Sequence, residues 1–434
     1  ALKGKKIPIS TGDAFLAYLD IFGYEELRVK SGSQIRSEIR SMWDEFRLRS
    51  EEEPVTLLLR PVRESANLLA SMMYTAPQTL KVAFVFHKSP LSSGWTYSHD
   101  LGRKYVEGVL GNRIVSTFRE NVLPDEGEEV IRQLIEEGNQ LIFTSSPVFL
   151  GSLLKASVEN PGVKILNCSL MASYQHIRAY YLRLFEAKFI MGAVAGAVSP
   201  NGRIGYVADY PIYGMPASIN AFALGAALVN PEAKVYLEWS TIVGHDPSET
   251  FRRENVTVIS NKDIGAPLFK SNRFGLYRET ENGPVTLATP IWHWGRMYEE
   301  IIRSVLDGSW KTPESGKPVR ALNYWWGMDS DSVDIRCSDA VPASTRRLAD
   351  ILRVSLQHGM VNPFSGRLFS QGRKPVNPKG ETLTPAEVVT MHWLSDNVIG
   401  EIPETETLTD DAKQIVTIQG LKGINELTAS QFTW

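Results

Sequence analysis

The feature that most constrains this chain is an alternation of short apolar segments with amphipathic ones, which begins near residue 81. Segments such as Lys81–Phe86 and Gln140–Ser145 are rich in β-branched and aromatic residues, as buried strands are. The segments between them, such as Tyr97–Leu110 and Gly127–Glu137, have apolar residues at helical spacing and stop beside a glycine. Strict alternation of strand and helix predicts parallel sheets with right-handed crossovers.

The alternation comes in two blocks, with one long helix predicted between them at Ala179–Val198. Further strands are expected at Arg113–Phe118, Lys164–Ser169, Arg203–Ala208, Lys234–Trp239, Asn255–Ser260, Arg273–Tyr277, Val285–Trp292 and Ala321–Trp326. Two such blocks predict an α/β fold of two doubly wound lobes. Ligands of such sheets bind at the carboxyl ends of the strands, so the loops that follow the strands are the candidate site.

The remaining parts of the chain are assigned as follows. Residues 1–78 are expected to form a helical extension, because apolar residues recur at helical spacing in segments such as Gln34–Arg49. Residues 79–404 form the two-lobe domain, with lobe 1 at about 79–198 and 285–330 and lobe 2 at about 199–284. The segment 331–404 is expected to close the hinge region, and 405–434 to be a tail. The segment 331–404 is expected to contain a hairpin in the Gly- and Pro-rich stretch 366–380 and a helix at Pro385–Asn397.

Composition excludes several classes of protein. A net charge of −3 without a block of basic residues argues against nucleic-acid binding. Two distant cysteines, Cys168 and Cys337, exclude a disulfide scaffold and a four-thiolate zinc site but leave the redox compartment open. No run of about 18 apolar residues could span a membrane. The chain begins at Ala1, which leaves open whether a leader was removed.

The sequence lacks the usual catalytic motifs, among them GxxxxGK[ST], GxGxxG after the first strand, HExxH, GxSxG and CxxC. Ser98, His99 and Asp100 are consecutive at a helix start, so their side chains diverge and cannot form a catalytic relay. The acidic run 329–334 lacks the glycine and glutamate of a calcium loop and is interpreted as a surface turn. We expect no catalytic residue, metal or cofactor.

Aromatic residues gather at the predicted strand ends. They are Trp95, Tyr97, Tyr210, Tyr213, Trp239, Tyr277, Trp292, Trp294, Tyr324, Trp325 and Trp326. Rings that face a cleft could stack on a planar ligand, although aromatic side chains also fill ordinary cores. Trp95 is the strongest ligand candidate, because it stands next to Gly94 in a polar, serine-rich loop.

A colinear series of short motifs resembles the basic membrane protein (BMP) family of substrate-binding lipoproteins of ABC transporters. The series begins with GWTYSHDLGR at 94–103 and continues with FEA at 185–187, GAVAG at 192–196 and GYVA at 205–208. It ends with LDGSW at 306–310, NPFSG at 362–366 and GEIP at 400–403, and so covers roughly residues 79–404.

The resemblance implies a type I periplasmic-binding-protein fold, in which two lobes joined by a hinge close on a ligand. It implies that Trp95 stacks on a purine. It also implies polar ligand contacts from Thr144, Ser145, Ser146, Asn167, Ser169 and Asp263, and a Trp-Gly pair near the hinge at Trp294. The chain departs from the family at Ser92-Ser93, where an acidic residue is usual, and in a shortened second lobe. The family's acidic turn near the last strand of the second lobe reads Leu276-Tyr277-Arg278-Glu279 here, so the carboxylate for ribose is either lost or shifted to Glu279. A base rather than a nucleoside, or a different planar ligand, becomes the more plausible ligand.

The expected function is therefore capture of a purine base or nucleoside outside the cytoplasm, in the periplasm or at the cell surface, by a monomer that serves an ABC permease. The alternative is a sensor that uses the same fold for signalling. A nucleoside hydrolase is disfavoured, because no Asp-rich segment follows the first strand. No lipobox cysteine occurs in residues 1–78, where a lipoprotein would need one at its mature start. The expectation is therefore a soluble periplasmic form, an anchor that precedes Ala1, or a regulatory role for the fold.

Overall fold

The structure is a computed structural model that describes residues 79–170, 177–269, 271–310 and 324–421. The chain divides into two units, 1–74 and 75–434, and every described residue belongs to the second. The predicted helical extension at 1–78 lies outside the described residues.

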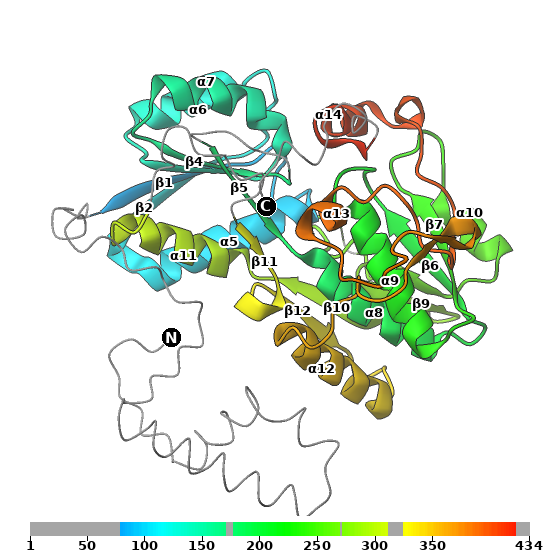
Figure 1. Cartoon of the computed structure of the whole chain (residues 1–434). Coiled ribbons are helices and arrows are strands. Elements are labelled where there is room, and N and C mark those ends of the chain that lie inside the picture. Colours follow the sequence, from blue (N-terminus) through cyan, green and yellow to red (C-terminus); the bar gives the residue numbers. More distant parts are fainter. Residues whose placement is uncertain (1–78, 171–176, 270, 311–323, 422–434) are drawn as a thin grey trace, which may run out of the picture. The chain divides into compact units, whose positions relative to one another are not determined.

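The first lobe is built on a six-stranded sheet with the order β11-β5-β4-β3-β1-β2, in which every neighbouring pair is parallel. Helices α6 and α7 lie over one face of this sheet, and α5 and α11 lie on the other (Figure 1). The elements of this lobe are β1 (Leu80–Val85), α5 (Gly94–Leu110), a 3-10 turn (Gly111–Arg113), β2 (Ile114–Arg119), α6 (Gly127–Glu136), β3 (Leu141–Thr144), a 3-10 turn (Pro147–Phe149), α7 (Leu150–Glu159), β4 (Lys164–Cys168), β5 (Ile177–Leu182), α11 (Trp294–Leu306) and β11 (Tyr324–Trp326).

The second lobe has a seven-stranded mixed sheet with the order β12-β10-β9-β8-β6-β7-β15. Strands β15, β7, β6 and β8 are parallel neighbours, whereas β8, β9, β10 and β12 pair antiparallel. The elements are α8 (Leu184–Val198), β6 (Arg203–Ala208), α9 (Met215–Val229), β7 (Lys234–Trp239), α10 (Pro247–Arg253), β8 (Val258–Ser260), β9 (Leu276–Thr280), β10 (Gly283–Trp292), a 3-10 turn (Met328–Ser330), β12 (Val333–Cys337), α12 (Ala343–Gln357) and β15 (Val398–Ile399).

This architecture confirms the predicted α/β fold class, a type I periplasmic-binding-protein fold of two lobes. The second sheet differs from the expectation of a wholly parallel order, because β9 and β10 form a hairpin. Its turn is closed by Gly283, whose φ of 100° is a conformation that side chains other than hydrogen disfavour. The strands predicted at 255–260 and 273–277 also begin later than expected, at Val258 and Leu276.

The single helix predicted at Ala179–Val198 is wrong. Residues Ile177–Leu182 form strand β5, and helix α8 starts only at Leu184. The sequence IRAYYL is rich in β-branched and aromatic residues and fits between β4 and β11, so its strand propensity overrides the helical pattern that follows.

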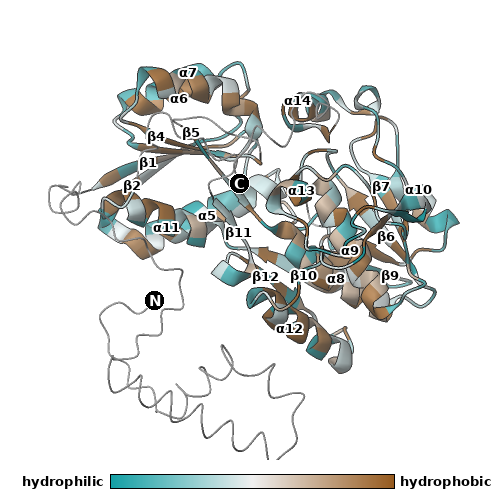
Figure 2. Cartoon of the chain, in the orientation of Figure 1, coloured by the Kyte–Doolittle hydropathy of each residue, from teal (hydrophilic) through white to brown (hydrophobic). Residues whose placement is uncertain are grey.

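Helices α8 and α9 pack against each other unusually closely in the second lobe. A Cβ atom added at Gly192 would lie 1.9 Å from the carbonyl oxygen of Phe222, and one at Gly225 would lie 2.0 Å from that of Phe189. Both helices are almost entirely hydrophobic (Figure 2), as expected for helices that are buried on most sides. Each large side chain buried here, such as Phe222, contributes about 1.5–3 kcal/mol to folding.

The chain passes between the lobes after β5, after β10 and after β11, and Arg183 ties the first and third of these crossings together. Its guanidinium donates to the carbonyl oxygen of Trp325 (2.8 Å) and pairs with Glu186 (2.6 Å) and Asp329 (2.5 Å). Glu186 accepts in turn from the backbone N–H of Met328 (2.6 Å). The hinge is therefore a hydrogen-bonded junction of adjacent segments.

The lobe boundaries differ from those expected. Strand β10 belongs to the second sheet, and α8 packs on α9 and α12, so both are parts of lobe 2. The segment expected at the hinge supplies β12, α12 and β15 to the same lobe. It also contains the predicted hairpin, β13 (Phe369–Ser370) and β14 (Lys374–Pro375) with a 3-10 turn (Gln371–Arg373), and α13 (Pro385–Val389), which is shorter than the predicted helix and starts at a capping box on Thr384. A 3-10 turn (Thr405–Thr407) and α14 (Asp410–Gln419) follow.

Candidate functional site

A cavity of about 1320 Å³ lies between the two lobes, at the carboxyl ends of the parallel strands. Loops after β1, β3 and β4 form its lobe 1 side, and loops after β6, β7 and β8 form its lobe 2 side. Small-molecule sites are typically about 300–1,000 Å³, so this cavity has room for a ligand of substantial size.

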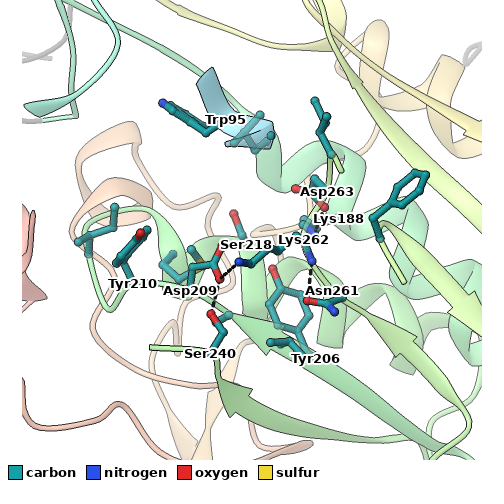
Figure 3. Close-up of a pocket in the computed structure, with 18 of the residues that line it drawn as sticks. Trp95, Lys188, Tyr206, Asp209, Tyr210, Ser218, Ser240, Asn261, Lys262 and Asp263 are labelled. Atoms are coloured by element: carbon teal, nitrogen blue, oxygen red, sulfur yellow. Dashed lines mark hydrogen bonds and ion pairs between the residues drawn. The ribbon is translucent and has the colours of Figure 1, made fainter. Parts of the chain in front are cut away.

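Trp95 is held rigidly on the lobe 1 side of the cavity (Figure 3). Ser93 caps helix α5 by accepting a hydrogen bond from the backbone N–H of Thr96 (3.2 Å), which fixes the start of the helix. The indole Nε1 of Trp95 donates to the carbonyl oxygen of Ser145 (2.8 Å). Its ring packs at 5.8 Å from that of Tyr181 and edge-on at 5.6 Å from that of Trp292. With its N–H already used, the ring can offer a ligand only its π-surface.

The facing wall, on lobe 2, contains a buried ion pair between Lys188 of α8 and Asp263 in the loop after β8 (Figure 3). The ammonium of Lys188 also lies 3.5 Å from the hydroxyl of Ser260 and 5.2 Å from the centre of the Tyr206 ring. Burial raises the pKa of Asp263, and the charge of Lys188 opposes that rise. The pair leaves Oδ2 of Asp263 without a donor among the described residues, so this oxygen is available to a ligand N–H or O–H.

Asp209, which directly follows β6, forms a second polar cluster in the same wall. Its carboxylate accepts a hydrogen bond from the hydroxyl of Ser240, and its backbone carbonyl accepts one from the hydroxyl of Thr241. The ammonium of Lys262 lies 3.9 Å from the same carboxylate and is largely exposed. The lobe 2 wall thus presents two carboxylates, each beside an ammonium group (Figure 3).

The two lobes touch at the edge of the cavity, so the structure is a closed arrangement. The backbone N–H of Leu268 in lobe 2 donates to the carbonyl oxygen of Leu91 in lobe 1 (3.0 Å). Gly94 lies so close to the Ile264 carbonyl that an added Cβ would stand 2.0 Å from the oxygen. Only glycine allows this approach.

Six of the side chains predicted for the site line the cavity: Trp95, Ser145, Ser146, Tyr210, Asp263 and Tyr277. Burial raises the pKa of Tyr277 to about 12, so its hydroxyl stays protonated at neutral pH. Glu279, the candidate ribose carboxylate, also lines the cavity, but Arg273 pairs with it at 2.5 Å.

The other six predicted residues lie behind the cavity wall or beside it: Tyr97, Thr144, Asn167, Ser169, Trp239 and Trp294. Asn167 donates to the hydroxyl of Thr144 (2.7 Å) and to the carbonyl oxygen of Ser146 (2.9 Å), and so supports the loop that reaches the cavity. Trp239 donates to the carbonyl oxygen of Glu401 (2.8 Å), and Trp294 is fully buried.

The cavity-lining residues that sequence reasoning missed include Tyr181, Lys188, Asp209, Ser240, Asn261 and Lys262. A usable signal existed for Lys188, because it and Glu186 are the only charged residues in the stretch 184–198. Asp209 could also have been found, because it directly follows a predicted strand. Tyr181 could not, because the segment that contains it was assigned to a helix.

The predicted divergence of Ser98, His99 and Asp100 is confirmed. Ser98 donates to the backbone of Trp95, and Asp100 pairs with Arg103 (2.8 Å). Nδ1 of His99 lies 2.5 Å from the Tyr298 hydroxyl, and burial lowers the pKa of the imidazole to about 3. His99 is therefore a neutral core residue.

Within the described ranges, no three His, Cys, Asp or Glu side chains are grouped so that they could hold a metal ion. None of the helices described is both long and apolar enough to cross a membrane.

Comparisons with known proteins agree with the resemblance found in the sequence. Residues 79–247 match the model of the Bmp family, described as ABC transporter substrate-binding protein PnrA-like. A purine-binding protein of Brucella abortus is 27% identical over 343 residues, which cover 76% of this chain and 95% of that protein. A protein of Haloferax volcanii, whose name proposes glucose binding for an ABC transporter, is 26% identical over 58% of this chain and 66% of its own length.

Solved structures share the fold at low sequence identity. An ABC transporter solute-binding protein of Conexibacter woesei superposes with a TM-score of 0.50 at 14% identity, over 65% of this chain and 98% of its own. A transcriptional activator of the comK gene from Bacillus halodurans superposes with a TM-score of 0.51 at 16% identity, over 64% and 98%. At such identities these similarities establish the fold alone.

Proposed function

We propose that this chain, whose resemblance to the BMP family of ABC transporter substrate-binding proteins the family model confirms, captures a purine base or nucleoside between its lobes. The protein releases its ligand to an ABC permease. It acts outside the cytoplasm, as solute-binding proteins of this family do, and as a monomer.

The observation that carries the proposal is the pairing of two unlike walls across one cavity. Trp95 supplies a fixed aromatic surface, and Asp263 supplies a carboxylate whose charge is balanced by Lys188. A purine has a flat ring to stack on the aromatic surface and N–H groups at its edge to donate to the carboxylate. Stacking is worth about 1–3 kcal/mol per ring.

The two named relatives support different ligands, purine for the Brucella protein and glucose for the Haloferax protein. The purine-binding relative aligns over nearly its whole length, and the cavity wall here contains several aromatic rings besides Trp95. Both points favour a planar ligand. A sugar can also stack and donate to carboxylates, so D-glucose belongs in the test.

The test is a thermal-shift screen of the full chain with adenine, guanine, adenosine, guanosine, uridine, flavin and D-glucose, followed by calorimetric titration of each compound that shifts the melting temperature. A ligand at 100 times its Kd should stabilise the folded state by about 2.7 kcal/mol. We expect shifts with purines alone. A shift with glucose and none with purines would replace the proposed ligand class, and no shift at all would contradict binding of these solutes.

A further inference from the structure

Helix α14 lies beyond the part of the chain that resembles the BMP family, and it is anchored on lobe 2. Its residues Ala412 and Val416, together with the preceding Leu408, pack on Tyr210 and Ile242 in the loops after β6 and β7. Two backbone hydrogen bonds hold the segment before the helix on the loop after β7. The N–H of Thr409 donates to the carbonyl oxygen of Thr241 (2.8 Å), and the N–H of Val243 donates to that of Thr407 (3.0 Å). The helix therefore has to move with lobe 2.

The same helix reaches across the cleft to lobe 1 (Figure 1). The carboxylate of Asp411 pairs with the ammonium of Lys88 (2.7 Å), in the loop after β1, and lies 3.9 Å from Nε2 of His87. At the other end of the helix, Gln419 donates to the hydroxyl of Ser169 after β4. Between them, Ile415 packs against the core of lobe 1. These contacts form only when the lobes are together.

Helix α14 is also part of the cavity wall. Ile415 and Gln419 both line the cavity, on a side that neither sheet covers. One helix thus joins the two lobes and covers the space between them.

We propose that α14 is a strap that rides on lobe 2, docks on lobe 1 when the cleft closes, and slows ligand release. Asp411 is the part of the strap that can be altered without changing a cavity-lining side chain, whereas its partner Lys88 lies at the edge of the cavity. This inference rests on the proposed function only in so far as the closed cleft holds a ligand.

Neighbouring aspartates allow a matched test. Asp411 reaches Lys88 on the other lobe, whereas Asp410 pairs with Lys413 of its own helix (3.3 Å) and is almost fully exposed. Asp411→Lys places an ammonium group beside that of Lys88, and Asp410→Lys makes the same change of net charge without affecting lobe 1.

Two measurements are made on the full-length variants. The first is hydrogen exchange in ligand-free protein, followed at the Leu268 amide, which bonds to Leu91 only across the closed cleft. The second is the dissociation rate of adenosine from Trp fluorescence. Because a surface ion pair is a weak contact, we expect exchange and dissociation to be about 3- to 10-fold faster in Asp411→Lys. We expect Asp410→Lys to behave as wild type. We expect the double variant Lys88→Asp/Asp411→Lys, in which the two charges are swapped, to restore both rates.

Equal exchange at Leu268 in the Asp411→Lys and Asp410→Lys variants would overturn the strap. Failure of the wild-type chain to bind adenosine would instead count against the proposed function. The exchange measurement needs no ligand, so it would still decide whether α14 holds the lobes together.

Discussion

The two lobes meet the same cavity with different chemistry. Lobe 1 offers mainly neutral surface, from Trp95, Tyr181 and Leu170, and its cation there, Lys88, lies beside His87 at the edge that α14 covers. Lobe 2 offers many charged and polar groups, among them Lys188, Asp209, Ser240, Asn261, Lys262 and Asp263. The comparison suggests that the two lobes have different roles. Lobe 1 would provide shape and an aromatic stacking surface, and lobe 2 would distinguish ligands by their hydrogen-bond donors and acceptors.

The sheets differ in a way that fits this division. The parallel sheet of lobe 1 is enclosed by helices on both faces, as all-parallel sheets are, and its buried strands support a rigid aromatic wall. In lobe 2 the antiparallel strands β9 and β10 connect through a tight hairpin at Gly283, so the loop after β8 is followed by a hairpin and not by a crossover helix. That loop contains Lys262 and Asp263, two of the charges that line the cavity.

The change expected to have the largest effect keeps the lobe 1 and lobe 2 walls of the cavity apart. Gly94→Ala would place a methyl group 2.0 Å from the Ile264 carbonyl oxygen across the cleft, so the lobes cannot close fully. We expect calorimetry with the purine found in the screen to give a loss of about 3 kcal/mol in affinity, the upper part of the range for an overpacked contact. Gly108→Ala, in the same helix with no atom within 4 Å, is the control and should bind normally. Normal binding by Gly94→Ala would mean that the ligand is held with the lobes apart.

The second change removes the charge from lobe 2 and leaves lobe 1 intact. Asp263→Asn keeps the size of the side chain but loses the anionic acceptor beside Lys188. Hydrogen bonds to charged groups contribute about 1.5–3 kcal/mol, so calorimetry should give a loss of about 2 kcal/mol. Because the substitution leaves the buried Lys188 without its carboxylate, circular dichroism is used to check that the variant still folds. An unchanged Kd would remove Asp263 from the ligand site.

The pH dependence of binding tests the same carboxylate. Burial raises the pKa of Asp263 above its usual value, and the groups that face it are Lys188, Tyr206, Asp209 and Tyr181. As the pH falls through this raised pKa, the carboxylate becomes protonated and stops accepting from the ligand. Affinity should therefore be complete above that pKa and weaken below it, at a higher pH than an exposed aspartate would produce. In Asp263→Asn this dependence should disappear.

In both lobes the sequence predicted isolated strands better than it predicted the pairing between strands, for physical reasons. Strands such as β1 and β3 are short apolar runs enclosed by helices, and local pattern alone identifies them. Strand β5 was missed because its aromatic and β-branched residues run directly into an apolar helix, and only pairing with β4 and β11 makes it a strand. The antiparallel pairing of β9 and β10 is likewise a tertiary choice that strand propensity does not encode.

The candidate site was predictable where it follows strand ends and less so where it depends on packing. Trp95 and Ser145 lie in loops after strands, so the topology alone points to the cavity. Whether Thr144 or its neighbour Ser145 reaches the cavity depends on the alternation of side chains along β3, which a strand end leaves open. Lys188 lies on a helix, outside the loops that the topology rule selects.

A third change weakens the lobe 1 wall. Trp95→Ala removes the stacking surface, and we expect calorimetry to give a loss of about 1–2 kcal/mol, the lower part of the range for a stacked ring. The lower part applies because Trp95 shares the wall with Tyr181 and Trp292. Trp95→Phe keeps a ring but loses the bond to Ser145, so its loss should be smaller. If the Ala and Phe variants lose equal affinity, the hydrogen bond matters and the stacking does not.

The smallest effect is expected at the exposed end of the lobe 2 wall. Lys262 lies 3.9 Å from Asp209 and its side chain is 62% exposed, so the pair is screened by water and salt. Lys262→Met should change the calorimetric affinity for the same purine by less than about 0.5 kcal/mol, and the change should shrink further in high salt. Such a result, beside the larger loss at Asp263, would localise recognition to the buried part of lobe 2, because only there is a charge protected from solvent. A loss as large as that of Asp263→Asn would instead mean that the ligand spans the whole polar wall and contacts Lys262 directly.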